Sequence, residues 1–197
     1  MNIFVKICGL RSAEHVSAAI EAGADAVGFV FANSVRKIGP LEAAAISTNV
    51  PPHIKRVAVM MHPTDEEWQK VLREFSPDVL QTDAEDFSSL DIPDSIEPWP
   101  VYREGRSQPG TPSTYIFEGP KSGQGETVDW SRAATIAKCG QMILAGGLGA
   151  HNVAEAIRTV RPFGVDVSSA VESAPGQKDN QLIKDFVIAA KAAEKEL

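Results

Sequence analysis

Reactive side chains stand at or shortly after the ends of short apolar runs in this chain. Cys8 and Glu118 each close such a run, and Arg36 lies shortly beyond the run at 26–31. A thiol or carboxyl in such a place can serve as base or acid, and the planar fork of arginine suits a substrate carboxylate. Each residue also has a plainer interpretation: a core thiol, a solvated loop glutamate and a surface arginine. The residue types alone leave both interpretations open.

Two residue pairs, Gly146-Gly147 and Ser168-Ser169, follow the last two apolar runs. Glycines expose bare backbone N–H groups and serines add hydroxyl donors, a combination that suits a phosphate group. The alternative is that the glycines only turn the chain and the serines cap a helix. Because barrel enzymes commonly bind phosphate after their seventh and eighth strands, the positions favour a phosphate site.

These residues need elements to position them, and the chain alternates short apolar runs with helical patterns. Strands are expected at 3–7, 26–31, 57–61, 78–81, 99–102, 115–117, 142–145 and 165–167. Helices are expected after Ser12 and at 41–46, 64–75, 129–138, 153–160 and 182–190. Strand–helix repeats pair their strands in parallel, and eight repeats close a barrel. We therefore expect an α/β fold, a (β/α)8 TIM barrel, with residues 1–197 as a single catalytic domain.

One part of the pattern is irregular. The segment 105–112 is rich in glycine and proline and cannot form a helix, so a regular fifth helix is expected to be missing. Pro98 and Pro100 are expected to damage the hydrogen-bond ladder of the fifth strand. The rival fold is an open, doubly wound sheet with fewer strands.

Composition and net charge limit the classes of partner and the location that we expect for this protein. The net charge of −7 over 197 residues argues against nucleic acid and against an anionic membrane surface. The two cysteines form no disulfide framework and no metal motif, and Cys139 is interpreted as inert packing. His62 is interpreted as a solvated loop residue. Residues 1–6 do not read as a signal peptide and no apolar run reaches transmembrane length, so a cytoplasmic location is expected.

Several motifs, in order along the chain, resemble those of the phosphoribosylanthranilate isomerase family of tryptophan biosynthesis. The first and last together are highly specific, and the likeness spans the whole chain. The matching segments are VKICGL at 5–10, GADAVGFVF at 23–31 with SVR at 34–36, GQG at 123–125 with DW at 129–130, LAGGL at 144–148, RPFGVDVSSAVE at 161–172 and PGQKD at 175–179.

The resemblance implies the role of each site residue. Cys8 would be the general base, and Glu118, standing where the family has aspartate, the general acid. Arg36 would bind the anthranilate carboxylate. Asp166 would lie near the ribose. The phosphate would bind to the loops that contain Gly146, Gly147, Ser168 and Ser169.

The chain departs from the family pattern beside the expected acid. Glu118 replaces the aspartate, and the loop after it is shorter. Gln81-Thr82-Asp83 replaces the family's Q-L-H-G, which makes Asp83 a rival carboxylate. We expect Gln81 and Asp83 to line the substrate site.

The family reaction is an Amadori rearrangement of a phosphorylated aminoaldose to an aminoketose. One acid and one base suffice and the substrate nitrogen is the electron sink, so no cofactor or metal is implied. Lys6 would share a strand face with Cys8 and lower the pKa of its thiol. The remaining alternatives are a catalytically silent barrel that binds a phosphorylated metabolite and a sugar-phosphate isomerase of histidine synthesis. The latter relies on aspartates at strands one and five, whereas strand one here ends in Cys8. A monomer or weak homodimer is expected.

Overall fold

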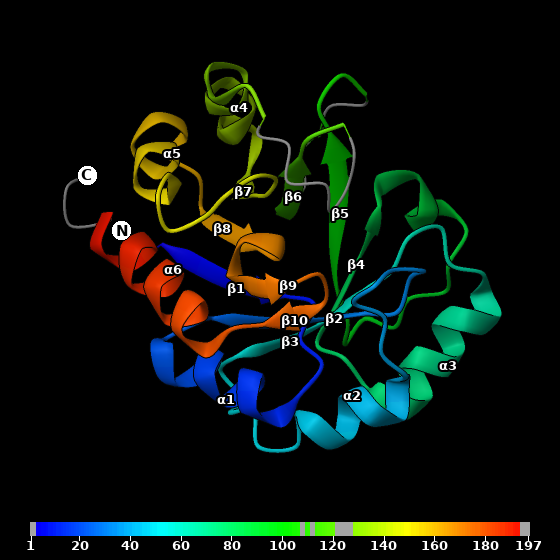
Figure 1. Ribbon diagram of the computed structural model, residues 1–197. Coiled ribbons are helices and arrows are strands. Elements are labelled where there is room, and N and C mark those ends of the chain that lie inside the picture. The colour runs from blue at the N-terminus through cyan, green and yellow to red at the C-terminus, as the bar shows by residue number, and fades with distance from the viewer. Residues whose placement is uncertain (1–2, 107–108, 111–112, 121–127, 194–197) are drawn as a thin grey trace.

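Eight parallel strands form a closed barrel in the computed structural model, which describes residues 3–106, 109–110, 113–120 and 128–193 (Figure 1). Each strand pairs with its neighbours in sequence, and the first pairs with the eighth to close the ring. The expected TIM barrel is therefore confirmed, and the open sheet is excluded. The strands are β1 (Phe4–Cys8), β2 (Ala26–Val30), β3 (Lys55–Val59), β4 (Val79–Asp83), β5 (Glu97–Arg103), β6 (Thr114–Glu118), β7 (Gln141–Leu144) and β8 (Gly164–Val167).

Helices follow most strands, and their starts agree with the capping signals in the sequence. Ser12, Thr64 and Asp129 each cap a helix by accepting backbone N–H groups. The α-helices are α1 (Ala13–Ala22), α2 (Pro40–Ile46), α3 (Asp65–Phe75), α4 (Trp130–Ile136), α5 (Val153–Val160) and α6 (Asn180–Ala193). Three short 3₁₀ turns are η1 (Ala84–Ser88), η2 (Ala137–Cys139) and η3 (Ser169–Val171), and a hairpin of β9 (Glu172–Ala174) and β10 (Gln177–Lys178) precedes α6.

The alternation of side chains along each strand separates two apolar layers. Outward-facing residues such as Ile7, Phe29 and Leu80 pack against the helices. Inward-facing residues such as Val79 and Trp99 fill the barrel interior. The inward face of the strands is the one that delivers side chains to the carboxyl end of the barrel.

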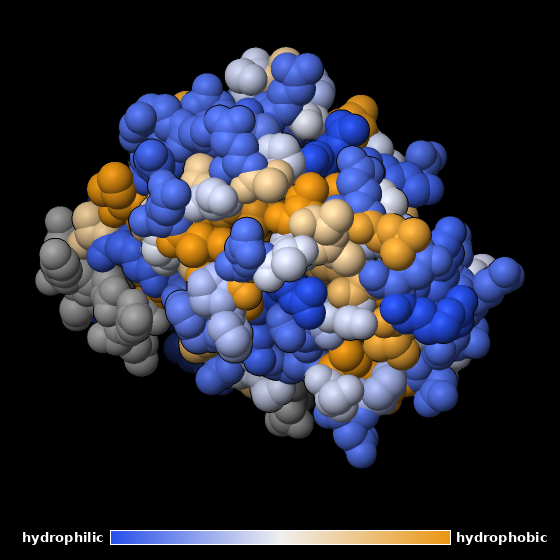
Figure 2. All heavy atoms as spheres, turned by 90° about the horizontal axis from the view of Figure 1, so that it is seen from below, coloured by the Kyte–Doolittle hydropathy of each residue, from blue (hydrophilic) through white to orange (hydrophobic). Residues whose placement is uncertain are grey.

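At the surface of the molecule, the face seen in Figure 2 is mostly hydrophilic, with apolar residues visible in a band between the polar ones.

The prolines of β5 do not interrupt the barrel, contrary to expectation. The Glu97 N–H donates to the Asp78 carbonyl at 3.0 Å, so alternation turns the positions of Pro98 and Pro100 away from β4. On their own side, pairing with β6 begins only at Val101. The two prolines thus occupy positions where no ladder donor is required.

The connections around β5 contain little helix. Between β5 and β6 the described residues form turns and no helix, in agreement with the expected loss of the fifth helix. The preceding connection, for which no helix is expected from the sequence either, has η1 as its only helical element between β4 and β5. Within the described ranges, no helix is long and apolar enough to cross a membrane.

The capping box of α3 offers a test of local stability. The Thr64 hydroxyl accepts the Glu67 N–H at 3.2 Å, and the Glu67 carboxylate accepts the Thr64 N–H at 2.8 Å. We expect Thr64→Ala to lower the free energy of unfolding by about 1 kcal/mol, because it leaves an N–H of the first turn without its acceptor. Urea unfolding followed by tryptophan fluorescence measures the change.

The matched control is Thr48→Ala, since the exposed Thr48 hydroxyl only donates to carbonyls of the preceding turns. It should change stability by less than about 0.5 kcal/mol. Equal losses in the two variants would show that the capping box contributes nothing specific.

Candidate active site

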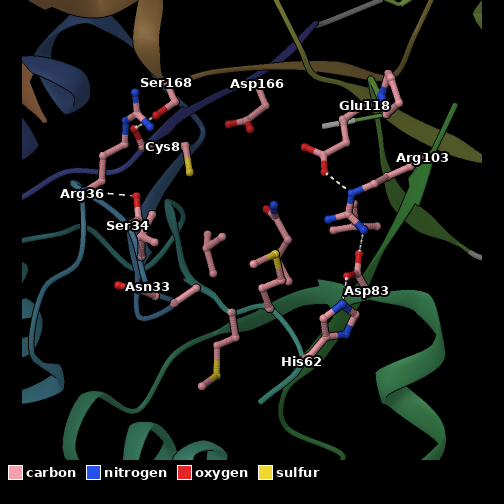
Figure 3. Close-up of a pocket in the computed structure, with 18 of the residues that line it drawn as sticks. Cys8, Asn33, Ser34, Arg36, His62, Asp83, Arg103, Glu118, Asp166 and Ser168 are labelled. Atoms are coloured by element: carbon pink, nitrogen blue, oxygen red, sulfur yellow. Dashed lines mark hydrogen bonds and ion pairs between the residues drawn. The ribbon is translucent and has the colours of Figure 1, made fainter. Parts of the chain in front are cut away.

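A cavity of about 520 Å³ opens at the carboxyl ends of the barrel strands, where active sites of this fold lie (Figure 3). It gathers residues from seven of the eight strands or from the loops that follow them. Of the residues that the sequence singled out, the cavity contains Cys8, Arg36, Gln81, Asp83, Glu118, Asp166 and Ser168. The sequence-predicted site residues are therefore brought together, although the roles assigned to them stay predictions.

A second, smaller cavity of about 60 Å³ adjoins the first. It contains the two residue pairs predicted to bind phosphate, Gly146-Gly147 and Ser168-Ser169. Both glycines have positive φ, 92° and 63°, which side chains rarely tolerate, so their backbone is kept bare. The two cavities share Glu118, Asp166 and Ser168, so one ligand can extend from the small cavity into the large one.

Cys8 lies at the end of β1, 6% exposed, on the same inward face as Lys6. The Lys6 ammonium is fully buried and donates to the Asp166 carboxylate at 2.8 Å. Burial raises the pKa of the Cys8 thiol, and the nearby Lys6 charge opposes this without overcoming it. Lys6 therefore acts in the predicted direction but leaves the pKa of Cys8 above its ordinary value.

Arg36 reaches the cavity from the loop after β2, and its side chain is oriented by a second charged group. Its Nε and Nη2 donate to the two carboxylate oxygens of Glu172 at 2.6 and 2.9 Å. This bidentate pair uses one edge of the guanidinium and leaves Nη1 on the other edge. The Arg36 backbone N–H is fixed by the Ser34 hydroxyl at 3.1 Å.

The opposite wall holds the two rival carboxylates, and one arginine joins them (Figure 3). Arg103 donates its Nε to Glu118 at 3.0 Å and its Nη1 to Asp83. Asp83 is 1% exposed, and its second oxygen lies 3.0 Å from His62 Nε2 without hydrogen-bond geometry. Beside it, Gln81 Oε1 is buried and has no hydrogen-bond partner among the described residues. This wall therefore presents buried acceptors toward the cavity.

His62, Asp83 and Asp86 form the one cluster in the described part of the chain whose donor atoms all lie close enough to hold a metal ion, within 4.8 Å. His62 Nδ1 lies 3.0 Å from Asp86, and Thr82 donates to the same carboxylate. The bond to Asp86 raises the pKa of His62 above its ordinary 6.5. With Arg103 on Asp83 as well, this cluster already neutralises its carboxylates, and a metal would have to displace those partners.

Comparison of the chain with known proteins identifies its family. The family model described as N-(5'-phosphoribosyl)anthranilate (PRA) isomerase matches residues 5–189. The chain belongs to the N-(5'-phosphoribosyl)anthranilate isomerase family. Among its relatives, the isomerase of Listeria monocytogenes is 38% identical over 98% of this chain and the whole of the relative. That of Bacillus cereus is 40% identical over 97% of this chain and the whole of the relative.

A solved structure of the family gives the same result for the fold. It is a phosphoribosylanthranilate isomerase in complex with reduced 1-(o-carboxyphenylamino)-1-deoxyribulose 5-phosphate. It is 31% identical to this chain, covers 96% of it and 99% of its own length, and superposes with a TM-score of 0.80. The chain described here is therefore an enzyme, an isomerase of tryptophan biosynthesis.

Several features of the site and its surroundings are not predicted by the sequence. Arg103 follows an expected strand, but nothing in the residues around it indicates that it pairs with two carboxylates. Glu172 lies within a segment that matches the family, and nothing there indicates its pairing with Arg36. His62, interpreted as a solvated loop residue, has a side chain 55% exposed but is paired with two carboxylates. Cys139, interpreted as packing, is exposed because it ends the 3₁₀ turn η2 instead of lying on the buried face of α4. In each case the deciding contact joins residues far apart in sequence or depends on where a helix ends.

The raised pKa of Cys8 predicts its reactivity. Iodoacetamide reacts with the thiolate, so a raised pKa means slow alkylation at neutral pH and a rate that increases with a midpoint above the ordinary 9.0. We expect this profile in a Cys139→Ser background, measured by mass spectrometry. The exposed Cys139 in a Cys8→Ser background is the matched control and should react faster at pH 7. A Cys8 midpoint below 9.0 would contradict the prediction.

Proposed function

We propose that the two adjoining cavities convert N-(5'-phosphoribosyl)anthranilate to 1-(2-carboxyphenylamino)-1-deoxyribulose 5-phosphate by acid–base catalysis. The observation that carries the proposal is that the thiol, the carboxyls and the anion-binding groups face a single cavity, which is continuous with the glycine and serine pocket. The relative crystallised with the reduced product analogue supports a ligand with one carboxylate and one phosphate.

The ligand has an anion at each end, and the site offers a place for both. We assign the phosphate to Gly146, Gly147 and Ser169, with Ser168 at the boundary between the cavities. The Ser168 hydroxyl donates to the Cys8 carbonyl at 3.1 Å, so it must turn in order to donate to a phosphate oxygen. We assign the carboxylate to Arg36, whose Nη1 edge is not used by Glu172.

In the proposed reaction, Glu118 is protonated at the start, and the single positive charge of Arg103 balances Asp83. Glu118 gives its proton to the furanose ring oxygen as the bond from C1′ to that oxygen breaks and the anilino nitrogen forms a Schiff base. Cys8 then removes the C2′ proton, and the enolamine tautomerises to the ketone. Because burial raises the pKa of Cys8, the thiol needs help to act as a base. The cationic Schiff base supplies it, since a positive charge beside the thiol favours thiolate and also acidifies C2′.

Asp166 has a supporting place in this scheme. It is 8% exposed, it lines both cavities and its carboxylate is bound to Lys6. A carboxylate facing the sugar can accept a hydrogen bond from a ribose hydroxyl, which fits the role that the family resemblance implies for Asp166. Gln81 and Asp83 are assigned to the far wall, where the unpartnered Gln81 Oε1 can accept a substrate hydroxyl.

Turnover of N-(5'-phosphoribosyl)anthranilate tests the activity, with the aminoaldose of histidine synthesis as the alternative substrate. We expect turnover of the first only, because strand one ends in Cys8 and not in an aspartate. Cys8→Ser should lower kcat by about 10²- to 10⁴-fold while KM changes little, since an alcohol of similar volume is far less ionised at neutral pH and so supplies almost none of the anionic base. Near-normal kcat in this variant would remove Cys8 from the mechanism. Product formation with neither substrate would favour the silent barrel.

The choice between the two carboxylates needs its own experiment. Glu118→Gln keeps the shape of the side chain and removes its proton, so we expect kcat to fall by about 10²-fold or more. Asp83→Asn should act mainly on KM, because Asp83 is paired with Arg103 and is assigned to the wall of the site. Steady-state kinetics of the two variants separates these cases. The reverse pattern would make Asp83 the acid.

A further inference from the structure

The hairpin β9–β10 places two buried charges beside the proposed carboxylate site, and the chemistry described above uses neither of them. The Glu172 side chain is 4% exposed and that of Lys178 is 1% exposed. Glu172 binds Arg36 with both oxygens and also accepts the Lys178 ammonium at 2.7 Å and the Gly176 N–H at 3.1 Å. A carboxylate with this many donors is held in one orientation, and so is the guanidinium that it binds.

Lys178 extends the network to the phosphate pocket. Besides Glu172, its ammonium donates to the Ser168 carbonyl at 2.8 Å and to the Ser168 hydroxyl at 3.2 Å. An ammonium has three donors, and these three acceptors use all of them. Lys178 therefore connects the serine between the two cavities to the carboxylate that orients Arg36.

The charges in this network do not cancel. Burial alone would raise the pKa of Glu172, but Arg36 and Lys178 hold it at about 2, so the carboxylate stays ionised. Burial lowers the pKa of Lys178, and the Glu172 charge limits that change. With both side chains charged, two cations share one anion and one positive charge remains in a mostly buried network. An anionic ligand on Arg36 supplies the missing counter-charge.

A purely structural role for Glu172 would be to hold the loop of Arg36 in place, but that loop has other supports. A Cβ on Gly176, whose φ is 79°, would lie 2.7 Å from the Val35 carbonyl, so hairpin and loop are in direct backbone contact. Arg11 donates to the same carbonyl at 3.2 Å. The loop is thus packed without Glu172, whose hydrogen bonds to that loop go only to the Arg36 guanidinium.

We infer that Glu172 and Lys178 are positioning residues that set the distance and direction between the carboxylate-binding and phosphate-binding ends of the site. Glu172 turns the free edge of Arg36 toward the ligand, and Lys178 fixes Ser168 relative to that edge. This inference rests on the proposed assignment of the substrate carboxylate to Arg36.

The test is Glu172→Gln, with anthranilate and inorganic phosphate as separate probes of the two ends. Without the bidentate partner, Arg36 loses its orientation, so we expect anthranilate affinity to fall by about 10- to 100-fold, the worth of a charged hydrogen bond. Phosphate affinity should change less than about threefold, and KM should rise more than kcat falls. Calorimetric titration and steady-state kinetics measure these quantities. A loss of affinity for both probes alike, or for neither, would overturn the inference.

Glu172→Gln leaves the buried Lys178 without its counter-charge, so a second variant protects the test. Glu172→Gln with Lys178→Met removes one charge of each sign and keeps the net charge of the network. We expect it to fold and to lose affinity for anthranilate, and for phosphate as well, because Ser168 loses its donor. Unchanged affinity for both probes in the double variant would also overturn the inference. The matched control is Glu97→Gln, a paired glutamate at the opposite end of the barrel, which should change neither affinity.

Arg36→Met separates this inference from the proposed function. If Arg36→Met leaves anthranilate affinity unchanged, the assignment of the carboxylate to Arg36 is wrong and the positioning role falls with it. If Arg36→Met loses that affinity while Glu172→Gln keeps it, the assignment stands and only the positioning role is wrong.

Discussion

The barrel closes around a buried ammonium. Lys6 is fully buried on β1. A buried ammonium without a partner of opposite charge would strongly destabilise the fold, so it has to be paired. Its partner, Asp166, stands on β8 at the directly paired position of the seam where the barrel closes. A slip of one residue in that register would turn Asp166 outward and leave the charge alone, so this ion pair specifies the closure. Gly28 on β2 leaves the space, since a Cβ there would lie 3.2 Å from Lys6 Cε and from the Cys8 sulfur.

The same principle extends over the floor and walls of the site, where most of the buried charges have a partner of opposite sign. Lys6 pairs with Asp166. Arg36 and Lys178 both pair with Glu172. Arg103 pairs with Asp83 and Glu118. A ligand entering such a site exchanges partners with groups that are already desolvated and oriented, so little reorganisation is needed on binding. The site is therefore best described as three ion-pair networks around one cavity, with the neutral thiol of Cys8 among them.

The sequence predicted what depends on local patterns and missed what depends on contacts across the barrel. Strand alternation and helix caps such as Thr64 are local, and they placed the elements to within a few residues. The strand ends then indicated Cys8, Glu118 and the loops to which we assign the phosphate. By contrast, Arg36 and Glu172 are separated by 136 positions, and nothing in the sequence around either residue reveals their pairing. The predicted damage to the hydrogen-bond ladder by the prolines of β5 was wrong for a related reason. The effect of a proline in a strand depends on which neighbouring strand its backbone faces.

The arrangement of the walls also bears on how one site can hold an acid and a base. In Figure 3, Arg36 and Cys8 lie on one side of the cavity, while Glu118, Arg103 and Asp83 lie on the other. Under the proposed roles, the base and the acid then approach the ribose from different sides, and neither can replace the other. Arg103 ties Glu118 to Asp83, so the side chain that stands in the acid position is part of a network, not a lone carboxyl. Under the proposed roles, the hydrogen bond from Arg103 then helps to fix where the carboxyl group of this longer side chain lies.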